Sequence, residues 1–154
     1  MNTIISVMLL YVFNSFHQDA YSFIAQYILE HINVIEKISI DKLAYECGTS
    51  TTTINKFCKQ LGLDNYKHLK GMLVNTKEGR IEQIEKRYRQ FNCEQFYSRI
   101  GLKNNIDDFN DCIERVVDLI YNAHKIHMIG AVYPLSLTLN FVEDMILFGK
   151  DFCF

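Results

Sequence analysis

The sequence predicts a mainly α-helical protein that ends in a short α/β segment. The chain has one proline and seven glycines in 154 residues, its apolar residues recur three and four positions apart over most of its length, and 49% of its residues are hydrophobic. This composition is sufficient for a buried core. We divide the chain into a helical bundle at residues 1–75, a linker helix at 76–105, and an incomplete α/β segment at 106–154 with one or two short parallel strands.

The first region is expected to consist of consecutive helices. Its N-terminal apolar run, residues 1–13, follows no basic segment and is too short to span a bilayer, so we expect a buried helix or a dimer contact and no membrane association. Residues 19–32 have one apolar stripe at helical spacing. The residues of this stripe are Ala20, Phe23, Ile24, Tyr27, Ile28 and Ile32.

Two short helices that meet at a tight corner are predicted between residues 39 and 61. Ser39 and Ser50 stand where N-caps are expected. Ala44 is small enough for the second helix to cross the first, and Gly48, four residues later, can adopt the positive φ of the corner. Gly62 would end the second helix. The expected inward residues are Leu43, Cys47, Ile54, Phe57 and Leu61. This pattern is typical of a helix-turn-helix.

The outer side of the second helix carries residue types that contact DNA. Asparagine can bond adenine, lysine can bond guanine edges, and the amides near Ser50 can bond a phosphate. A following helix at residues 65–74 would add phosphate contacts. Residues 50–77 hold five lysines and one acid, a net charge of +4, whereas the whole chain carries −2. The expected DNA-binding residues are Ser50, Thr51, Thr52, Asn55, Lys56, Lys59, Lys67 and Lys70. An ordinary solvated helical hairpin is the alternative.

The second half of the chain differs from the first in its net charge and in its pattern of apolar residues. Residues 106–123 form an amphipathic helical pattern with five acids and one arginine, a net charge of −4. An apolar run at 125–130 predicts a strand, Pro134 can open the next helix, Gly149 can end it, and residues 151–154 resemble another strand. Two short strands cannot stabilise a sheet alone, so we expect this segment to pack on the first region or on another copy.

Other chemistry has little support in the sequence. The five cysteines are odd in number and include no C-x-x-C pair, which favours a reducing, cytoplasmic location, with Cys47 and Cys58 as small core residues. His124 and His127 have no nearby carboxylate or cysteine to complete a metal site. We therefore predict no enzymatic activity, no metal and no cofactor.

A family resemblance lies in the same residues as the helix-turn-helix pattern. Residues 39–62 and 64–70 resemble the N-terminal domain of RpiR-type transcriptional regulators, with Lys56 at the position of the usual arginine. The matching residues are Ser50, Thr53, Ile54, Lys56, Phe57, Lys59, Leu61, Gly62, Tyr66, Leu69 and Lys70. The resemblance implies a DNA-binding transcriptional regulator of carbohydrate-metabolism genes, which binds double-stranded operator DNA. We expect a homodimer, because the apolar stripes exceed the needs of one small core.

The C-terminal part resembles the opening of a sugar isomerase (SIS) domain, which senses phosphorylated sugars in that family. The resemblance covers residues 123–130 and 141–149, and it implies ligand binding at Gly130 and Ser136. Pro134 stands where the phosphate-binding serine would be, so a sugar-phosphate effector is not expected for this chain alone. Two alternatives remain: a sugar-phosphate-binding SIS fragment, and an interaction module that forms mixed dimers with a full-length relative.

Overall fold

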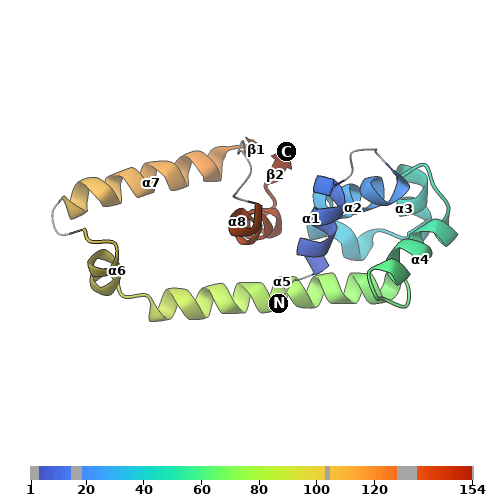
Figure 1. Ribbon diagram of the computed structural model, residues 1–154, viewed down its shortest axis with the longest axis horizontal. Helices are drawn as coiled ribbons and strands as arrows, with labels where there is room; N and C mark the ends of the chain where they lie inside the picture. Colours follow the sequence, from blue (N-terminus) through green and yellow to red (C-terminus); the bar gives the residue numbers. More distant parts are fainter. Residues whose placement is uncertain (1–3, 15–18, 103–104, 128–134, 154) are drawn as a thin grey trace.

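The computed structural model describes residues 4–14, 19–102, 105–127 and 135–153, and in this part the chain is mainly helical (Figure 1). The side chains of Asn14 and of residues 135–138 and 151–153 are not among those described. The elements are α1 (Ile4–Asn14), α2 (Ala20–Glu30), the 3-10 helix η1 (Ile32–Lys37), α3 (Ile40–Glu46), α4 (Thr51–Gln60), α5 (Tyr66–Gln90), α6 (Cys93–Arg99), α7 (Ile106–Asn122), β1 (Lys125–His127), α8 (Leu135–Leu147) and β2 (Asp151–Cys153).

Local side-chain chemistry accounts for the helix boundaries near the corner. The hydroxyl of Ser39 accepts a hydrogen bond from the third backbone N–H of α3, and that of Ser50 does the same for α4, both at 3.1 Å. Both predicted N-caps are therefore confirmed. Gly48 and Gly62 have φ of +59° and +79°, a conformation that a side chain would strain.

The hydrophobic core lies in the bundle, which we define as α1, α2, η1, α3, α4 and the N-terminal half of α5. Phe57 is fully buried, and the rings of Tyr11 and Tyr21 each lie 5.6 Å from its ring. The N-terminal apolar run contributes α1 to this core, so the buried-helix expectation describes it correctly. The residues with the largest fully buried side chains here are Ile5, Met8, Leu9, Ile24, Ile28, Ile35, Leu43, Ile54, Phe57, Leu69 and Leu73.

Helix α5 is longer than the sequence pattern suggested. We expected one helix at residues 65–74 and a separate linker helix from 76, but α5 runs without interruption from Tyr66 to Gln90. No proline interrupts it, and its apolar stripe continues through Ile81 and Ile84. The chain turns at Phe91 and Asn92 instead, where the Asn92 side chain caps α6.

The C-terminal half of α5, α6 and α7 form an extended arm, residues 77–122. Figure 1 shows α5 leaving the bundle, α6 turning the chain, and α7 returning in the opposite direction. Among the residues that the structure describes, α6 and α7 contain none that is buried. The ring of Tyr97 in α6 packs edge-on against Phe109 in α7. The arm therefore has local contacts but no core of its own.

The last segment returns to the bundle. Strands β1 and β2 pair in parallel, with Ile126 opposite Phe152. Helix α8 lies between them in sequence and contacts α1 and η1. Its Asp144 forms a bidentate ion pair with Arg80 of α5, with N–O distances of 2.6 and 2.9 Å. This hydrogen-bonded pair raises the pKa of Arg80, although burial opposes the shift.

Further contacts hold α8 in place. Val142, Ile146 and Leu147 are buried, and the buried Glu143 carboxylate accepts a hydrogen bond from the Ser6 hydroxyl. Asn33 of η1 donates to the Ile146 carbonyl at 3.4 Å. The C-terminal segment is therefore packed on the bundle, in agreement with one of the two arrangements expected from its short strands.

Candidate nucleic-acid interface

The corner between α3 and α4 has the geometry of a helix-turn-helix. The backbone N–H of Gly48 bonds the Tyr45 carbonyl at 3.0 Å, and that of Thr49 bonds the Ala44 carbonyl at 2.8 Å. These two bonds close the C-terminus of α3 and direct the chain into α4. Leu43 and Ile54, one from each helix, are both fully buried. The inner faces are therefore occupied by the core, and the outer face of α4 is left to solvent.

The exposed side of α4 is a row of one threonine and two lysines. Thr52, Lys56 and Lys59 are all exposed, and their spacing of four and three residues places them along one side of the helix. Ser50 is exposed at the start of the helix, where its hydroxyl serves as the cap, and Thr51 is half-buried. Of the predicted residues of α4, the structure brings Thr52, Lys56 and Lys59 together on the accessible side.

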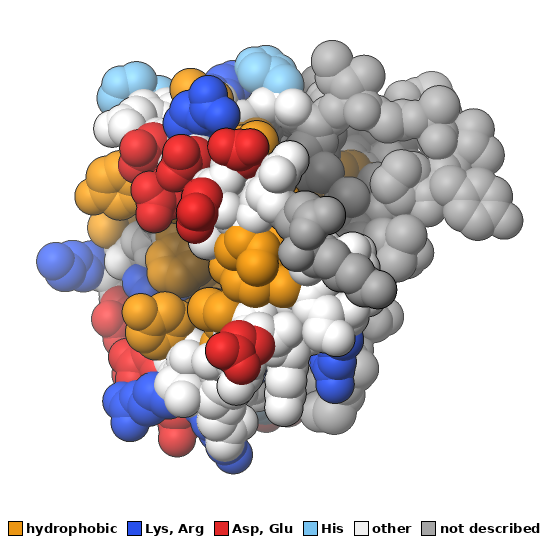
Figure 2. Space-filling view, turned by 90° about the vertical axis from the view of Figure 1, so that its left-hand side faces the viewer, with side chains coloured by type: hydrophobic (Ala, Val, Ile, Leu, Met, Phe, Trp, Pro, Cys, Tyr) orange, Lys and Arg blue, Asp and Glu red, His pale blue; other side chains and the backbone are white. Residues whose placement is uncertain are grey.

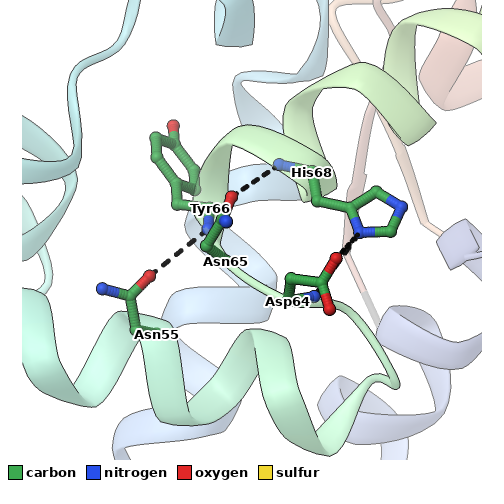
Figure 3. Close-up of polar contacts among 5 residues, drawn as sticks. All are labelled: Asn55, Asp64, Asn65, Tyr66 and His68. Carbon is green, nitrogen blue, oxygen red and sulfur yellow. Dashed lines mark hydrogen bonds and ion pairs between the residues drawn. The ribbon is translucent and has the colours of Figure 1, made fainter.

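Asn55 has a different environment from the one expected of a base-reading residue. Its side-chain oxygen accepts a hydrogen bond from the backbone N–H of Tyr66 at 3.3 Å, and the residue is half-buried. Figure 3 shows Asn55 reaching from α4 toward the first turn of α5. Asn55 therefore links α4 to the first turn of α5 in this structure.

Lys70 is also engaged within the protein. Its Nζ donates to the carbonyls of Glu36 and Ile38, each at 3.2 Å, and lies 5.3 Å from the ring centre of Tyr66. The Tyr66 hydroxyl donates to the same Ile38 carbonyl at 3.2 Å. Burial raises the pKa of Tyr66, so the phenol keeps its proton. Lys70 and Tyr66 thus donate hydrogen bonds to backbone carbonyls at the C-terminal end of η1.

The N-terminus of α5 contributes one further exposed lysine, Lys67. Beside it the Asn65 side chain caps α5 through the His68 backbone N–H at 3.0 Å, and Asp64 lies 3.1 Å from the His68 ring (Figure 3). Asp64, the one acidic residue of segment 50–77, is therefore adjacent to a histidine. Lys77 bonds Asn33 at 2.5 Å. Three of the five lysines, those at positions 56, 59 and 67, thus remain on the exposed surface near α4.

The polar links among α4, α5 and η1 were not predicted from the sequence. Tyr66 was noted only as a residue that matches the family pattern, and no local pattern identifies the Ile38 carbonyl as the partner of its hydroxyl. Gly130 lies outside the described residues, as does the side chain of Ser136. Within the described part of the chain, no group of three or more metal-ligating side chains occurs, and no helix is long and apolar enough to cross a membrane.

Comparison with known proteins agrees with this geometry. The family model for the helix-turn-helix domain of the rpiR family matches residues 17–77. Residues 17–77 are therefore similar to the helix-turn-helix domain of that family. The match covers the corner at Gly48, the exposed row of α4 and the first turns of α5.

Two curated relatives extend the similarity beyond this domain. The chain is 26% identical over 125 residues to the HTH-type transcriptional regulator HexR of Pseudomonas aeruginosa, covering 76% of this chain and 44% of the relative. It is 27% identical over 120 residues to an uncharacterized HTH-type transcriptional regulator of Caldanaerobacter subterraneus subsp. tengcongensis, covering 70% of this chain and 41% of the relative. The chain thus spans less than half the length of either relative. No solved structure matches it.

Proposed function

We propose that this chain is a DNA-binding transcriptional regulator that binds operator DNA as a homodimer. The observation that carries the proposal is the exposed row of Thr52, Lys56 and Lys59 on the second helix of an rpiR-family helix-turn-helix domain. The second helix of such a unit lies in the major groove, with its N-terminal residues at the base edges. The names of both relatives as transcriptional regulators support the same function.

The proposed roles follow from where the side chains lie. We propose that Thr52 and Lys56 contact bases and that Lys59 and Lys67 contact phosphates, since all four side chains are exposed. Ser50 and Thr51 stand at the N-terminus of α4, whose amides can approach a phosphate. Asn55 and Lys70 are assigned a positioning role, because their polar atoms bond Tyr66 and the end of η1.

The proposal also covers the segment that follows the domain. The order of β1, α8 and β2, with the two strands parallel, is the order expected at the start of a SIS domain. By family resemblance the regulated genes would serve carbohydrate metabolism, and the chain would have no catalytic activity. The proposed function does not include sugar-phosphate sensing, since Pro134 stands where the phosphate-binding serine would be.

A DNA titration at two salt concentrations tests this function. Duplexes selected from a random-sequence library would be titrated with the wild-type chain and with Lys56→Ala, Lys59→Ala and Lys86→Ala. Lys86 is an equally exposed lysine of the arm and is the matched control. We expect the two α4 variants to lose about tenfold in affinity, and Lys59→Ala to lower the salt slope by about one unit.

The control decides how the result is understood. Lys86→Ala is expected to bind like wild type, because it lies outside the α4 surface. An equal loss for all three variants would indicate attraction by net charge alone and would contradict a specific role for α4. Failure of the library to yield any salt-dependent duplex would contradict DNA binding itself.

A further inference from the structure

Helix α1 lies outside the residues that the family model matches, yet one of its side chains contacts α4. We propose that Tyr11 of α1 is a positioning residue, which holds the C-terminal end of α4 through Gln60 and so fixes the direction of the exposed row. The inference rests on the proposed function in one respect, since DNA binding makes the direction of α4 important. It assigns a role to a helix that the family match leaves out.

Tyr11 contacts two residues of α4 with different parts of its side chain. Its hydroxyl donates a hydrogen bond to the side-chain oxygen of Gln60 at 3.2 Å. Its ring lies edge-on to the ring of Phe57, with the ring centres 5.6 Å apart and the planes at 73°. Phe57 is fully buried and Gln60 is exposed. The half-buried tyrosine therefore joins the core of the bundle to the surface at the end of α4.

Gln60 is the last residue of α4 and continues the exposed row. It follows Lys56 by four residues and Thr52 by eight, a spacing that places the three on one side of the helix. Asn55 is held near the middle of α4 by the backbone N–H of Tyr66, whereas Tyr11 holds the last residue. Two polar contacts at different points along α4 restrict the pivoting of the helix on its buried face.

Helix α1 is well packed and can support this contact. Ile5, Met8 and Leu9 are fully buried in the core of the bundle. The Ser6 hydroxyl donates a hydrogen bond to the buried Glu143 carboxylate of α8, and α1 also contacts α2 and α5. The position of α1 is therefore set by three other helices, and the Tyr11 hydroxyl is a fixed point from which α4 can be held.

Tyr88 of the arm has the opposite environment and supplies a control. It is 82% exposed, and its hydroxyl forms no hydrogen bond with a described residue. Figure 2, which views the molecule from the side of the arm, shows hydrophobic side chains on the surface there, between acidic and basic ones. An exposed aromatic ring is thus a common feature of the arm. In Tyr11, by contrast, both the ring and the hydroxyl contact α4.

Matched variants test the role of the Tyr11 hydroxyl. Tyr11→Phe removes the hydroxyl and keeps the ring against Phe57. Tyr21→Phe makes the same change at the other ring that lies 5.6 Å from Phe57, and the Tyr21 hydroxyl forms no hydrogen bond with a described residue. Tyr11→Phe should lower the ratio of the affinities for a selected and a scrambled duplex about threefold, the effect of one lost hydrogen bond. Tyr21→Phe and Tyr88→Phe should keep the wild-type ratio.

The ratio separates a positioning role from a direct contact with DNA. A Tyr11 hydroxyl that bonded a phosphate would contribute equally to both duplexes, because phosphate contacts carry no sequence information. An equal loss of affinity on the two duplexes would therefore overturn the inference. An equal fall of the ratio in Tyr11→Phe and Tyr21→Phe would also overturn it, since it would reflect a change around Phe57.

A double-mutant cycle shows whether Tyr11 acts through Gln60. Gln60→Ala removes the acceptor of the hydrogen bond. In that background Tyr11→Phe should have no further effect on the affinity ratio, because the contact is already lost. Independent, additive effects of the two substitutions would overturn the inference.

Hydrogen exchange gives a measurement that needs no DNA. The backbone N–H of Leu61 bonds the Phe57 carbonyl at 3.1 Å at the end of α4. This amide should exchange about threefold faster in Tyr11→Phe and at the wild-type rate in Tyr21→Phe. A chain that shows this difference but binds no duplex would contradict the proposed function and leave the support of α4 by Tyr11 standing. Unchanged exchange in Tyr11→Phe would overturn the inference, even in a chain that binds DNA.

Discussion

The bundle and the arm are both built from amphipathic helices, but only the bundle has a core. In the bundle, α4 presents Ile54 and Phe57 to α1, α2 and α3, and both side chains are fully buried. In the arm, α7 has an equally regular apolar face, and no described residue of it is buried. The difference shows that an apolar stripe predicts a helix and a direction of burial, whereas the covering partner depends on the rest of the assembly.

The largest expected difference between the two regions concerns phenylalanine. Phe57→Ala should lower the free energy of unfolding by about 3–5 kcal/mol, because it leaves a cavity beside the two aromatic rings of Tyr11 and Tyr21. Phe91→Ala, at a residue 57% exposed, should cost less than about 1 kcal/mol. Urea unfolding followed by circular dichroism measures both. Similar losses would contradict the distinction between bundle and arm.

A smaller effect is expected where the arm meets the bundle. The Arg80–Asp144 pair is mostly buried and bidentate, whereas the Arg89–Glu85 pair farther along α5 is exposed, with an N–O distance of 3.3 Å. A double-mutant cycle to alanine should give a coupling of about 1–3 kcal/mol for the first pair and less than about 0.5 kcal/mol for the second. Equal couplings would show that α8 is not anchored through Arg80.

The smallest expected effect is a pH dependence carried by the cysteines. Cys58 of the bundle is buried, and burial raises its pKa to about 11, whereas Cys93 and Cys112 of the arm are exposed. Above pH 9 the unfolded thiol loses its proton while the folded one keeps it, so stability should fall as pH rises from 9 toward 11. Cys58→Ala should remove part of that loss, as measured by urea unfolding at pH 8 and pH 10.

The arm provides the control for this pH dependence. Cys93→Ala removes an exposed thiol and should leave the alkaline loss unchanged. Cys47 and Tyr66 also have raised pKa values, so some of the loss should remain in Cys58→Ala. A flatter profile in Cys93→Ala than in Cys58→Ala would contradict the assignment.

The helix-turn-helix could be predicted because its determinants are local. Ser39, Gly48 and Ser50 act on backbone groups within a few residues, and the structure confirms each of them in its expected conformation. The inward positions of Ile54 and Phe57 followed from helical spacing alone. The same spacing places Thr52, Lys56 and Lys59 on the opposite, exposed side of α4.

The orientation of the polar residues could not be predicted in the same way. Asn55 has the spacing of a surface residue, but the direction of α5 brings the Tyr66 N–H within its reach. Lys70 likewise bonds the carbonyl of Ile38, which follows η1 and lies 32 residues earlier in the chain. Such contacts depend on how whole helices cross, which a single sequence does not specify. The length of α5 was underestimated because its polar second half was interpreted as a change of element.

The unbroken course of α5 has a consequence for how this protein can vary. The helix runs from the helix-turn-helix domain into the arm with 25 continuous residues. One residue inserted along it would rotate everything beyond by about 100° and advance it by about 1.5 Å. Substitutions in this stretch preserve the rotation of the arm about the α5 axis relative to α4. Short insertions and deletions change that rotation. Tolerance to changes of length should therefore follow the helical repeat, recovering only near multiples of a full turn.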